Sequence, residues 1–261
     1  MRAHIRYSAA TFYVHFLDLF GRAWRRSAGL WRRASGAPPG GNKPGMESAM
    51  GLLAREMFLL FPTGFFTGTL PDITLCDRVE KTLRDLQKSG QGYTAKTYLR
   101  NYMTPDNLQT LPEMKELVDI ILEESKTILD VYRIKRDSHY IANMWANISS
   151  PNRRHNTHAH SNSLLSGVVY IRTPPGCGRT LFFSPRHLAT GILPDVTQKT
   201  DLNADTFVPP TEKGRMVIWP SYLPHSVDNG DANDEEDRIV VAFNIMIRAK
   251  IGHLTAALDL S

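Results

Sequence analysis

Two segments of the chain carry apolar residues at the spacing of an amphipathic helix. In residues 77–88 they recur every three or four positions, and Ser89-Gly90 then supplies a typical helix end. A second run of the same period follows Thr110 and Glu113, which have the spacing of a capping box, and continues to about Val131. The pattern predicts one helix in each segment, the second being the longer.

Beyond residue 136 the pattern changes to short runs rich in β-branched and aromatic residues, separated by Pro, Gly and Asn. Such runs are typical of an antiparallel sandwich or barrel. Because the helices precede the strands, we expect an α+β domain in which N-terminal helices brace one face of the β-structure. No glycine-rich phosphate loop joins a strand to a helix, which disfavours the nucleotide-binding folds. The predicted strands are 140–147, 165–172, 180–183, 214–219 and 238–247.

The first 45 of the 261 residues differ in charge from the rest. They carry eight basic residues and one acidic residue, a net charge of +7, whereas residues 46–261 carry −2. A stretch rich in Gly and Pro, 34–45, reads as a flexible linker. Three explanations compete for this extension: a start upstream of the true initiator Met46, an organelle-targeting presequence, or a basic membrane-surface segment. We therefore divide the chain into an extension, 1–45, and a domain, 46–261.

The near-neutral domain offers no general attraction for a phosphate backbone, so we expect no nucleic-acid partner for it. No transmembrane helix is predicted, because the most apolar piece, 9–20, is shorter than the roughly 20 residues that span a bilayer. Cys76 and Cys177 are too few for a disulfide framework or a cysteine zinc site, and they fit a reducing compartment. The cytoplasm is the default location, and an organelle is the alternative if residues 1–45 are a presequence.

Histidines supply the candidate chemistry. His155, His158 and His160 lie within six positions. In an extended segment His158 and His160 point to the same side, because side chains alternate along a strand. His225 lies just beyond a predicted strand that could return to the same end, which makes it the candidate third ligand. Three neutral imidazoles suit Fe(II), Zn or Cu and leave positions open for a small molecule or dioxygen. We expect His155 to lie beside the metal or toward solvent.

Arg238 is a charged residue at the start of an apolar strand, and it needs a partner. Arginine is the natural bidentate clamp for a carboxylate, so beside a metal it would suit a dicarboxylate that chelates the ion at its other end. The equally weighted alternative is a salt bridge to an acidic neighbour within 234–237.

At this point the sequence resembles the iron(II)- and 2-oxoglutarate-dependent oxygenases, in particular a little-characterised branch with an HxHxxSxxSG core. The resemblance covers roughly residues 59–248, and its specificity comes from the ordered set of motifs. It implies a double-stranded β-helix, or jelly roll, with iron at its mouth. The motifs are Asn143-Met144-Trp145-Ala146-Asn147, His158-Ala159-His160, Ser166-Gly167-Val168-Val169-Tyr170, Ser184-Pro185-Arg186, Pro220 to Val227, and Arg238 to Asn244.

The resemblance assigns roles residue by residue. His158 matches the first metal ligand, His225 the distal ligand, and Arg238 the residue that pairs with the far carboxylate of 2-oxoglutarate. Tyr170 matches a strand tyrosine that in prolyl hydroxylases helps to hold that carboxylate. The implied reaction uses Fe(II), 2-oxoglutarate and dioxygen to hydroxylate a small-molecule or peptide substrate, with release of succinate and CO2. Residues expected near the site or the substrate are Asn147, His155, Arg186 and Asn244.

The sequence departs from the wider superfamily at His160, which stands where an aspartate or glutamate belongs. We favour ligation by His160, the alternative being that it turns away and leaves a water in its place. A neutral ligand there removes one negative charge from the site, which weakens iron binding.

Two other functions stay open. Gly214, Pro220, His225 and Asn229 fall at the spacing of a cupin motif, apart from Tyr222 at the position of its glycine. A cupin-like enzyme would be a three-histidine dioxygenase or isomerase with no need for 2-oxoglutarate. The other alternative is a non-catalytic β-sandwich that binds a ligand or a partner protein. The sequence leaves the oligomeric state and the identity of the substrate open.

Overall fold

The computed structural model describes residues 61–94, 101–150, 153–186, 195–200, 202–231 and 236–261. The predicted extension, 1–45, and Met46 lie outside these residues. All the described residues belong to one compact unit, Leu60–Ser261. Within them, no helix combines the length and the apolar character that crossing a membrane requires.

The two predicted helices are present as α2 (Thr74–Lys88) and α3 (Lys115–Val131). Helix α2 starts three residues before the predicted segment. The Asp72 carboxylate accepts the backbone N–H of Thr74 at 2.9 Å, so a side chain satisfies one of the donors that a first turn leaves free.

The predicted capping box is wrong. Thr110 ends a short 3-10 helix, η1 (Leu108–Thr110), and its hydroxyl donates to the carbonyl of Asn107 at 2.8 Å. Leu111 is extended, because the ring of the following Pro112 disfavours the helical region for the residue before it. A second 3-10 turn, η2 (Pro112–Met114), leads into α3, whose N-cap has no side-chain hydrogen bond.

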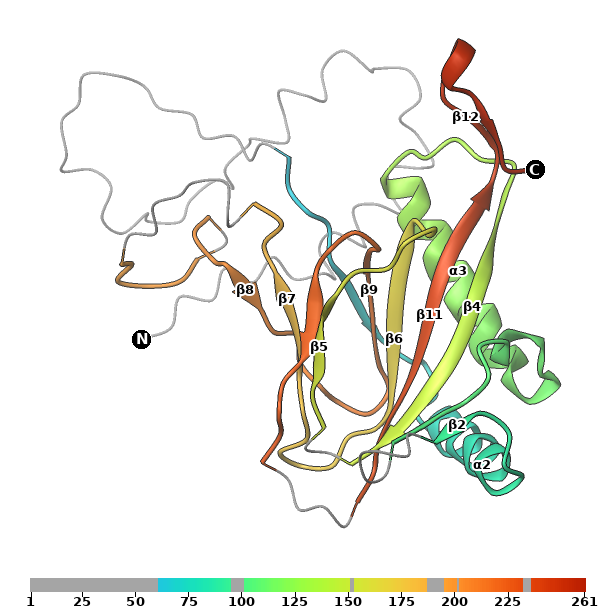
Figure 1. Cartoon of the computed structure of the whole chain (residues 1–261), viewed down its shortest axis with the longest axis vertical. Coiled ribbons are helices and arrows are strands. Elements are labelled where there is room, and N and C mark those ends of the chain that lie inside the picture. The colour runs from blue at the N-terminus through green and yellow to red at the C-terminus, as the bar shows by residue number, and fades with distance from the viewer. Residues whose placement is uncertain (1–60, 95–100, 151–152, 187–194, 201, 232–235) are drawn as a thin grey trace, which may run out of the picture. The chain divides into compact units, whose positions relative to one another are not determined.

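The strands form two large antiparallel sheets that face each other, with helices α2 and α3 outside the larger one (Figure 1). From β4 to β11 the chain passes repeatedly between the two sheets, which is the path of a jelly roll. The seven-stranded sheet has the order β1 (Phe66–Thr69), β9 (Arg215–Pro220), β6 (Leu165–Arg172), β11 (Arg238–Arg248), β4 (Ser138–Ser149), β3 (Asn101–Met103) and β2 (Tyr93–Thr94). The four-stranded sheet has the order β5 (His155–His158), β10 (His225–Val227), β7 (Thr180–Phe183) and β8 (Thr206–Phe207).

The chain ends with a small hairpin of β12 (Lys250–Ile251) and β13 (Leu258–Asp259), which flank a 3-10 turn, η4 (Leu254–Ala256). All five predicted strands are present, which confirms an α+β jelly roll braced by helices that precede it.

Alternation along the central strand β11 divides the apolar core in two. Val241 and Phe243 belong to the large cluster that the helices cover. Val240 belongs to a smaller cluster with members from both large sheets, such as Tyr170 on β6 and Phe182 on β7. Because successive side chains of a strand point to opposite faces, Arg238 lies on the same face as Val240, toward the space between the sheets.

Gly167 is required where β6 crosses β11. It pairs with Phe243, and a Cβ at this position would lie within 3 Å of three ring carbons of that fully buried side chain. We expect Gly167→Ala to destabilise the protein by about 1–3 kcal/mol, the usual cost of overpacking a core. The urea midpoint measures this cost. Gly68→Ala on β1 is the matched control, because a Cβ there meets nothing within 4 Å and the midpoint should stay unchanged.

Candidate metal centre

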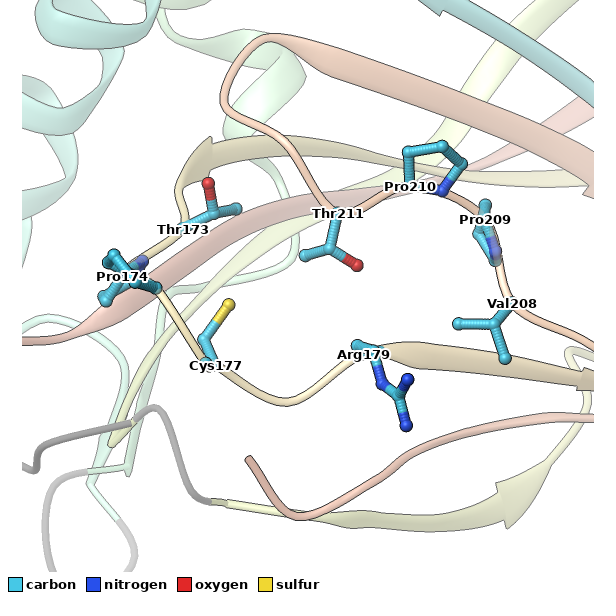
Figure 2. A pocket seen from close by; sticks show the side chains of 10 residues that line it. Thr173, Pro174, Cys177, Arg179, Val208, Pro209, Pro210 and Thr211 are labelled. Carbon is cyan, nitrogen blue, oxygen red and sulfur yellow. The ribbon is translucent and has the colours of Figure 1, made fainter. Parts of the chain in front are cut away.

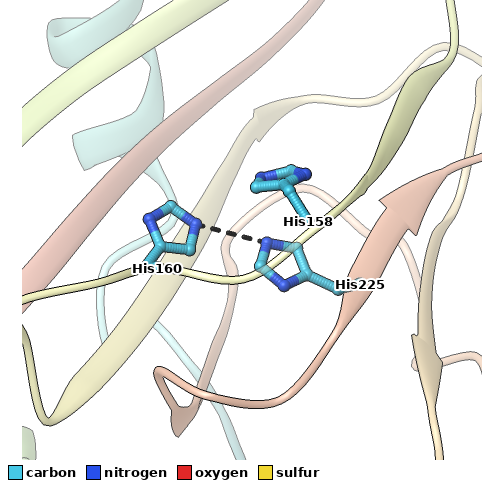
Figure 3. A group of neighbouring side chains, drawn as sticks. All are labelled: His158, His160 and His225. Atoms are coloured by element: carbon cyan, nitrogen blue, oxygen red, sulfur yellow. Dashed lines mark hydrogen bonds between the residues drawn. The ribbon is translucent and has the colours of Figure 1, made fainter.

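The structure brings His158, His160 and His225 together at one end of the space between the sheets (Figure 3). His158 ends β5 and His225 begins β10, and the two residues are direct partners in the antiparallel pair. His160 lies beyond the end of β5, so the extended segment that we expected to carry both histidines is shorter than predicted. Its ring nevertheless points at the other two (Figure 3).

The ring nitrogens have the spacing that ligands of one ion would have. One nitrogen from each histidine lies within 4.8 Å of the other two. The Nε2 atoms of His160 and His225 are 3.3 Å apart. Two nitrogens at about 2.0–2.1 Å from a tetrahedral ion are separated by about this distance.

Backbone carbonyls set the tautomers of two of these rings. His225 Nδ1 lies 3.0 Å from the carbonyl oxygen of Leu223, and His158 Nδ1 lies 2.8 Å from that of Asn156. A carbonyl oxygen only accepts, so both Nδ1 atoms carry the proton and both Nε2 atoms keep a lone pair. His160 Nε2 then donates to His225 Nε2 in the metal-free protein, and to ligate a metal through Nε2 His160 would adopt the other neutral tautomer, with its proton on Nδ1.

Exposure decreases across the cluster from His158, which is exposed, through His160 to His225, which is buried. The His225 ring centroid lies 4.9 Å from that of Trp219 and 5.7 Å from that of Phe182. Burial lowers the pKa of His225 to about 4, and burial followed by the charge of His158 lowers the pKa of His160 to about 4. Both rings are therefore neutral at pH 7 and able to ligate.

These shifted pKa values predict acid sensitivity of the metal-free protein. His160 and His225 titrate near 4 when folded and near 6.5 when unfolded, so the unfolded chain binds protons first as the pH falls. The free energy of unfolding is therefore highest above about pH 6.5, and it falls as the pH decreases from 6.5 to 4. Urea midpoints in chelator should be lower at pH 5 than at pH 7. His225→Phe should flatten that dependence, and an equally steep loss in this variant would contradict the assignment.

Arg238 is the second unusual polar group between the sheets. Its side chain is buried, and its Nε atom has no hydrogen-bond partner. The described acidic neighbours bond elsewhere, since Glu236 pairs with Arg172 and Asp237 pairs with Arg84. Of the alternative partners that the sequence offered, Asp234 and Glu235 lie outside the described residues. Among the ion pairs of the described residues, Arg238 therefore has no carboxylate partner.

Tyr170 and Thr180 lie beside Arg238. The Arg238 guanidinium carbon is 5.6 Å from the centroid of the Tyr170 ring, and the Tyr170 hydroxyl lies 2.9 Å from Thr180 Oγ1. Thr180 is two residues from Phe182, the partner of His225 on β7, which is roughly 7 Å along a strand. The arginine and the two hydroxyls thus form a second polar group, displaced along β7 from the position that pairs with His225.

A cavity of about 460 Å³ lies between the loop after β6 and the segment before β9 (Figure 2). Two proline pairs, 174–175 and 209–210, and Cys177 line it. Burial raises the pKa of the Cys177 thiol, and the nearby Arg238 guanidinium opposes that rise. Neither Arg238 nor any of the three histidines lines this cavity, and Cys177 is the lining residue that the arginine influences.

The other predicted site residues have separate surroundings. His155 pairs with Val227, and burial, then the charge of Arg238, lowers its pKa to about 4. Asn147 lies on β4 and pairs with Val240 on β11. Asn244 donates from Nδ2 to Asn143 Oδ1 at 2.7 Å. Arg186 lies on the exposed turn after β7, with its guanidinium carbon 6.0 Å from the Phe61 ring centroid.

Two residues near the centre were missed from the sequence. Thr180 meets the Tyr170 hydroxyl, and Trp145 places its ring centroid 5.9 Å from that of His160. Trp145 lies within the motif of residues 143–147, but the sequence predicted no function for it. Both contacts join parts of the chain that are not paired in a sheet, so only the packing of the two sheets reveals them.

Comparisons with known proteins agree with this arrangement. Residues 143–244 match a family described as "Putative 2OG-Fe(II) oxygenase". A prolyl-4-hydroxylase of Pseudomonas putida shares the fold at 14% identity and a TM-score of 0.51, over 72% of this chain and 94% of its own. The non-heme alpha ketoglutarate dependent carbocyclase SnoK from nogalamycin biosynthesis does so at 14% identity and a TM-score of 0.53, over 71% and 81%. No curated protein matches the sequence.

The matched segment contains the three histidines, Tyr170 and Arg238. The cupin-like and non-catalytic alternatives are not favoured by this match. Iron and 2-oxoglutarate are the cofactors of the family that it identifies. Residues 143–244, which carry every proposed ligand, therefore match the iron(II)- and 2-oxoglutarate-dependent oxygenase family, and the fold is the one that these solved structures share.

Proposed function

We propose that this chain is a dioxygenase that hydroxylates a small molecule or a peptide side chain, with release of succinate and CO2. His158, His160 and His225 hold the iron, and Arg238 holds the carboxylate of 2-oxoglutarate that lies farther from it. Iron, 2-oxoglutarate and dioxygen together supply the oxidising power that protein side chains lack.

The observation that carries this proposal is the buried Arg238 with an unpartnered Nε. A buried guanidinium without a carboxylate is costly, and a ligand carboxylate would satisfy it through two parallel hydrogen bonds. The Tyr170 ring lies beside it, and of the two linked hydroxyls of Tyr170 and Thr180 the one that accepts in their mutual bond keeps its own proton for a ligand carboxylate. The roughly 7 Å strand spacing between Thr180 and Phe182 suits a dicarboxylate of five carbons.

The three imidazoles also fit a metal ion, because His158 and His225 keep a lone pair on Nε2 and His160 gains one there when its proton moves from Nε2 to Nδ1. An all-histidine set brings no negative charge to the ion. We therefore expect 2-oxoglutarate to be the first anionic ligand and to strengthen the binding of iron.

Anaerobic titration of the Fe(II)-loaded protein with 2-oxoglutarate tests the proposal. We expect the weak visible charge-transfer band that bidentate chelation of Fe(II) produces, saturating at one equivalent. Succinate in place of 2-oxoglutarate is the control, because it lacks the keto group and should give no band. Iron binding without the band would reject the role of 2-oxoglutarate and favour a three-histidine enzyme that works without it.

A further inference from the structure

Ser221 is a buried serine that lies between the end of β9 and His225. Its carbonyl accepts the backbone N–H of His160 at 3.0 Å, and its own N–H donates to the carbonyl of Leu164 at 3.0 Å. These two bonds hold segment 160–164, which contains His160, against the segment that leads to His225. One residue therefore bonds the main chains of two segments that carry histidines.

The hydroxyl of Ser221 makes two further bonds, to Ser163 Oγ at 2.9 Å and to Ser166 Oγ at 2.8 Å. Ser166 also lies 2.7 Å from Asn244 Oδ1, an oxygen that only accepts, so Ser166 gives its one proton to Asn244. Ser221 must then donate to Ser166, and Ser163 donates to Ser221. Each hydroxyl proton of the cluster is thus used once, and the donors follow one another from Ser163 through Ser221 and Ser166 to Asn244.

The chain of bonds continues into the rigid part of the larger sheet. Asn244 on β11 donates to Asn143 on β4, and Ser166 lies on β6, so three adjacent strands of the sheet take part. Buried hydroxyls cost free energy unless they are bonded, and three alanines would fill nearly the same space. Unlike alanines, the serines fix the relative position of the segments that they join, because hydrogen bonds allow only one arrangement of these groups.

We propose that Ser221 is a positioning residue that sets the separation between His160 and His225. The inference rests on the proposed function, because it takes both histidines as metal ligands. The 3.3 Å gap between their Nε2 atoms depends on how segment 160–164 lies against residues 220–225. Ser221 bonds the first segment and belongs to the second, and its hydroxyl ties both to β6.

Titration of the metal-free protein with Co(II) alone tests this role, with the visible absorption of Co(II) as a signature of coordination geometry. We expect Ser221→Ala to weaken Co(II) binding about tenfold, the lower end of the effect of removing groups that orient ligands, and to change the spectrum. Ser163→Ala and Ser166→Ala should each weaken Co(II) binding by less than Ser221→Ala does. Because both act through Ser221, their double variant should equal Ser221→Ala, and adding Ser163→Ala to Ser221→Ala should change nothing further.

Tyr102→Phe is the control for the loss of a buried hydroxyl bond, since Tyr102 on β3 donates to the carbonyl of Gln91. It should lower the urea midpoint and leave the affinity for Co(II) and the spectrum unchanged. Unchanged Co(II) binding in Ser221→Ala, or an equal change in Tyr102→Phe, would overturn the inference. If Ser221→Ala does not fold, Ser163→Ala replaces it as the test, because Ser163 is only half-buried. The same change in Co(II) affinity and spectrum is then expected, to a smaller extent. Failure of the wild-type protein to bind Co(II) would instead reject the metal site of the proposed function.

Discussion

Replacement of His225 by alanine is expected to weaken Fe(II) binding at least about 100-fold and to abolish turnover. His225 is the buried member of the cluster, and its Nε2 lone pair is fixed by the bond from Nδ1 to Leu223. Loss of one of three ligands leaves two imidazoles, one of them exposed, to hold the ion. Metal content after dialysis without chelator, together with calorimetric titration, measures the loss.

Two variants separate this effect from damage to the fold. His225→Ala also leaves a space beside Trp219 and Phe182, which lowers stability. His158→Ala removes an exposed ring, so it should weaken metal binding with little loss of stability. His253→Ala, at an exposed histidine outside the cluster, should change neither. Full metal content in both His225→Ala and His158→Ala would show that the cluster is not the metal site.

Replacement of Arg238 by methionine should abolish stabilisation by 2-oxoglutarate while metal binding stays within about twofold. Two charge-assisted hydrogen bonds are worth about 3 kcal/mol or more, which corresponds to at least about a 100-fold loss of affinity. Arg238→Lys keeps the charge and loses the planar fork, so an intermediate affinity is expected. Thermal shift with and without 2-oxoglutarate, in the presence of Fe(II) under nitrogen, measures the difference.

The same variant distinguishes a ligand clamp from a structural ion pair. Arg238 has no carboxylate partner among the described residues, and a buried guanidinium without one destabilises the ligand-free protein, so Arg238→Met should raise its urea midpoint. A structural salt bridge predicts the opposite sign. Arg215→Met is the control, because Arg215 pairs with Glu212 at 2.6 Å and its loss should leave the response to 2-oxoglutarate unchanged. An unchanged response in Arg238→Met would contradict the proposed role.

The local patterns of the sequence were sufficient for the two helices, for five of the strands and for the three clustered histidines, but not for the shorter strands. Short runs rich in β-branched and aromatic residues predicted strands such as 165–172, and the two faces of β6 do pack against different apolar clusters. The start of α3 was mispredicted, because the effect of Pro112 on Leu111 outweighed the capping-box spacing. Local patterns decide such features only when neighbouring residues do not compete.

Contacts between distant strands could not be read from the sequence in the same way. His160 was expected to follow His158 along one strand, yet a bond to Ser221, 61 positions later, holds its backbone. Thr180 meets Tyr170 only because of how β7 lies across from β6. The ordered motifs of a known family compensated for part of this loss, and the match over residues 143–244 confirmed that family.

The proposed ligand groups belong to different sheets. His158 and His225 lie on the four-stranded sheet, whereas Arg238 begins the central strand β11 of the seven-stranded sheet. A dicarboxylate bound between metal and arginine would therefore tie one sheet to the other across their shared interior. Metal alone would not connect the two sheets. We therefore expect the amide hydrogens of both β10 and β11 to exchange slowly only when the metal and the dicarboxylate are both bound.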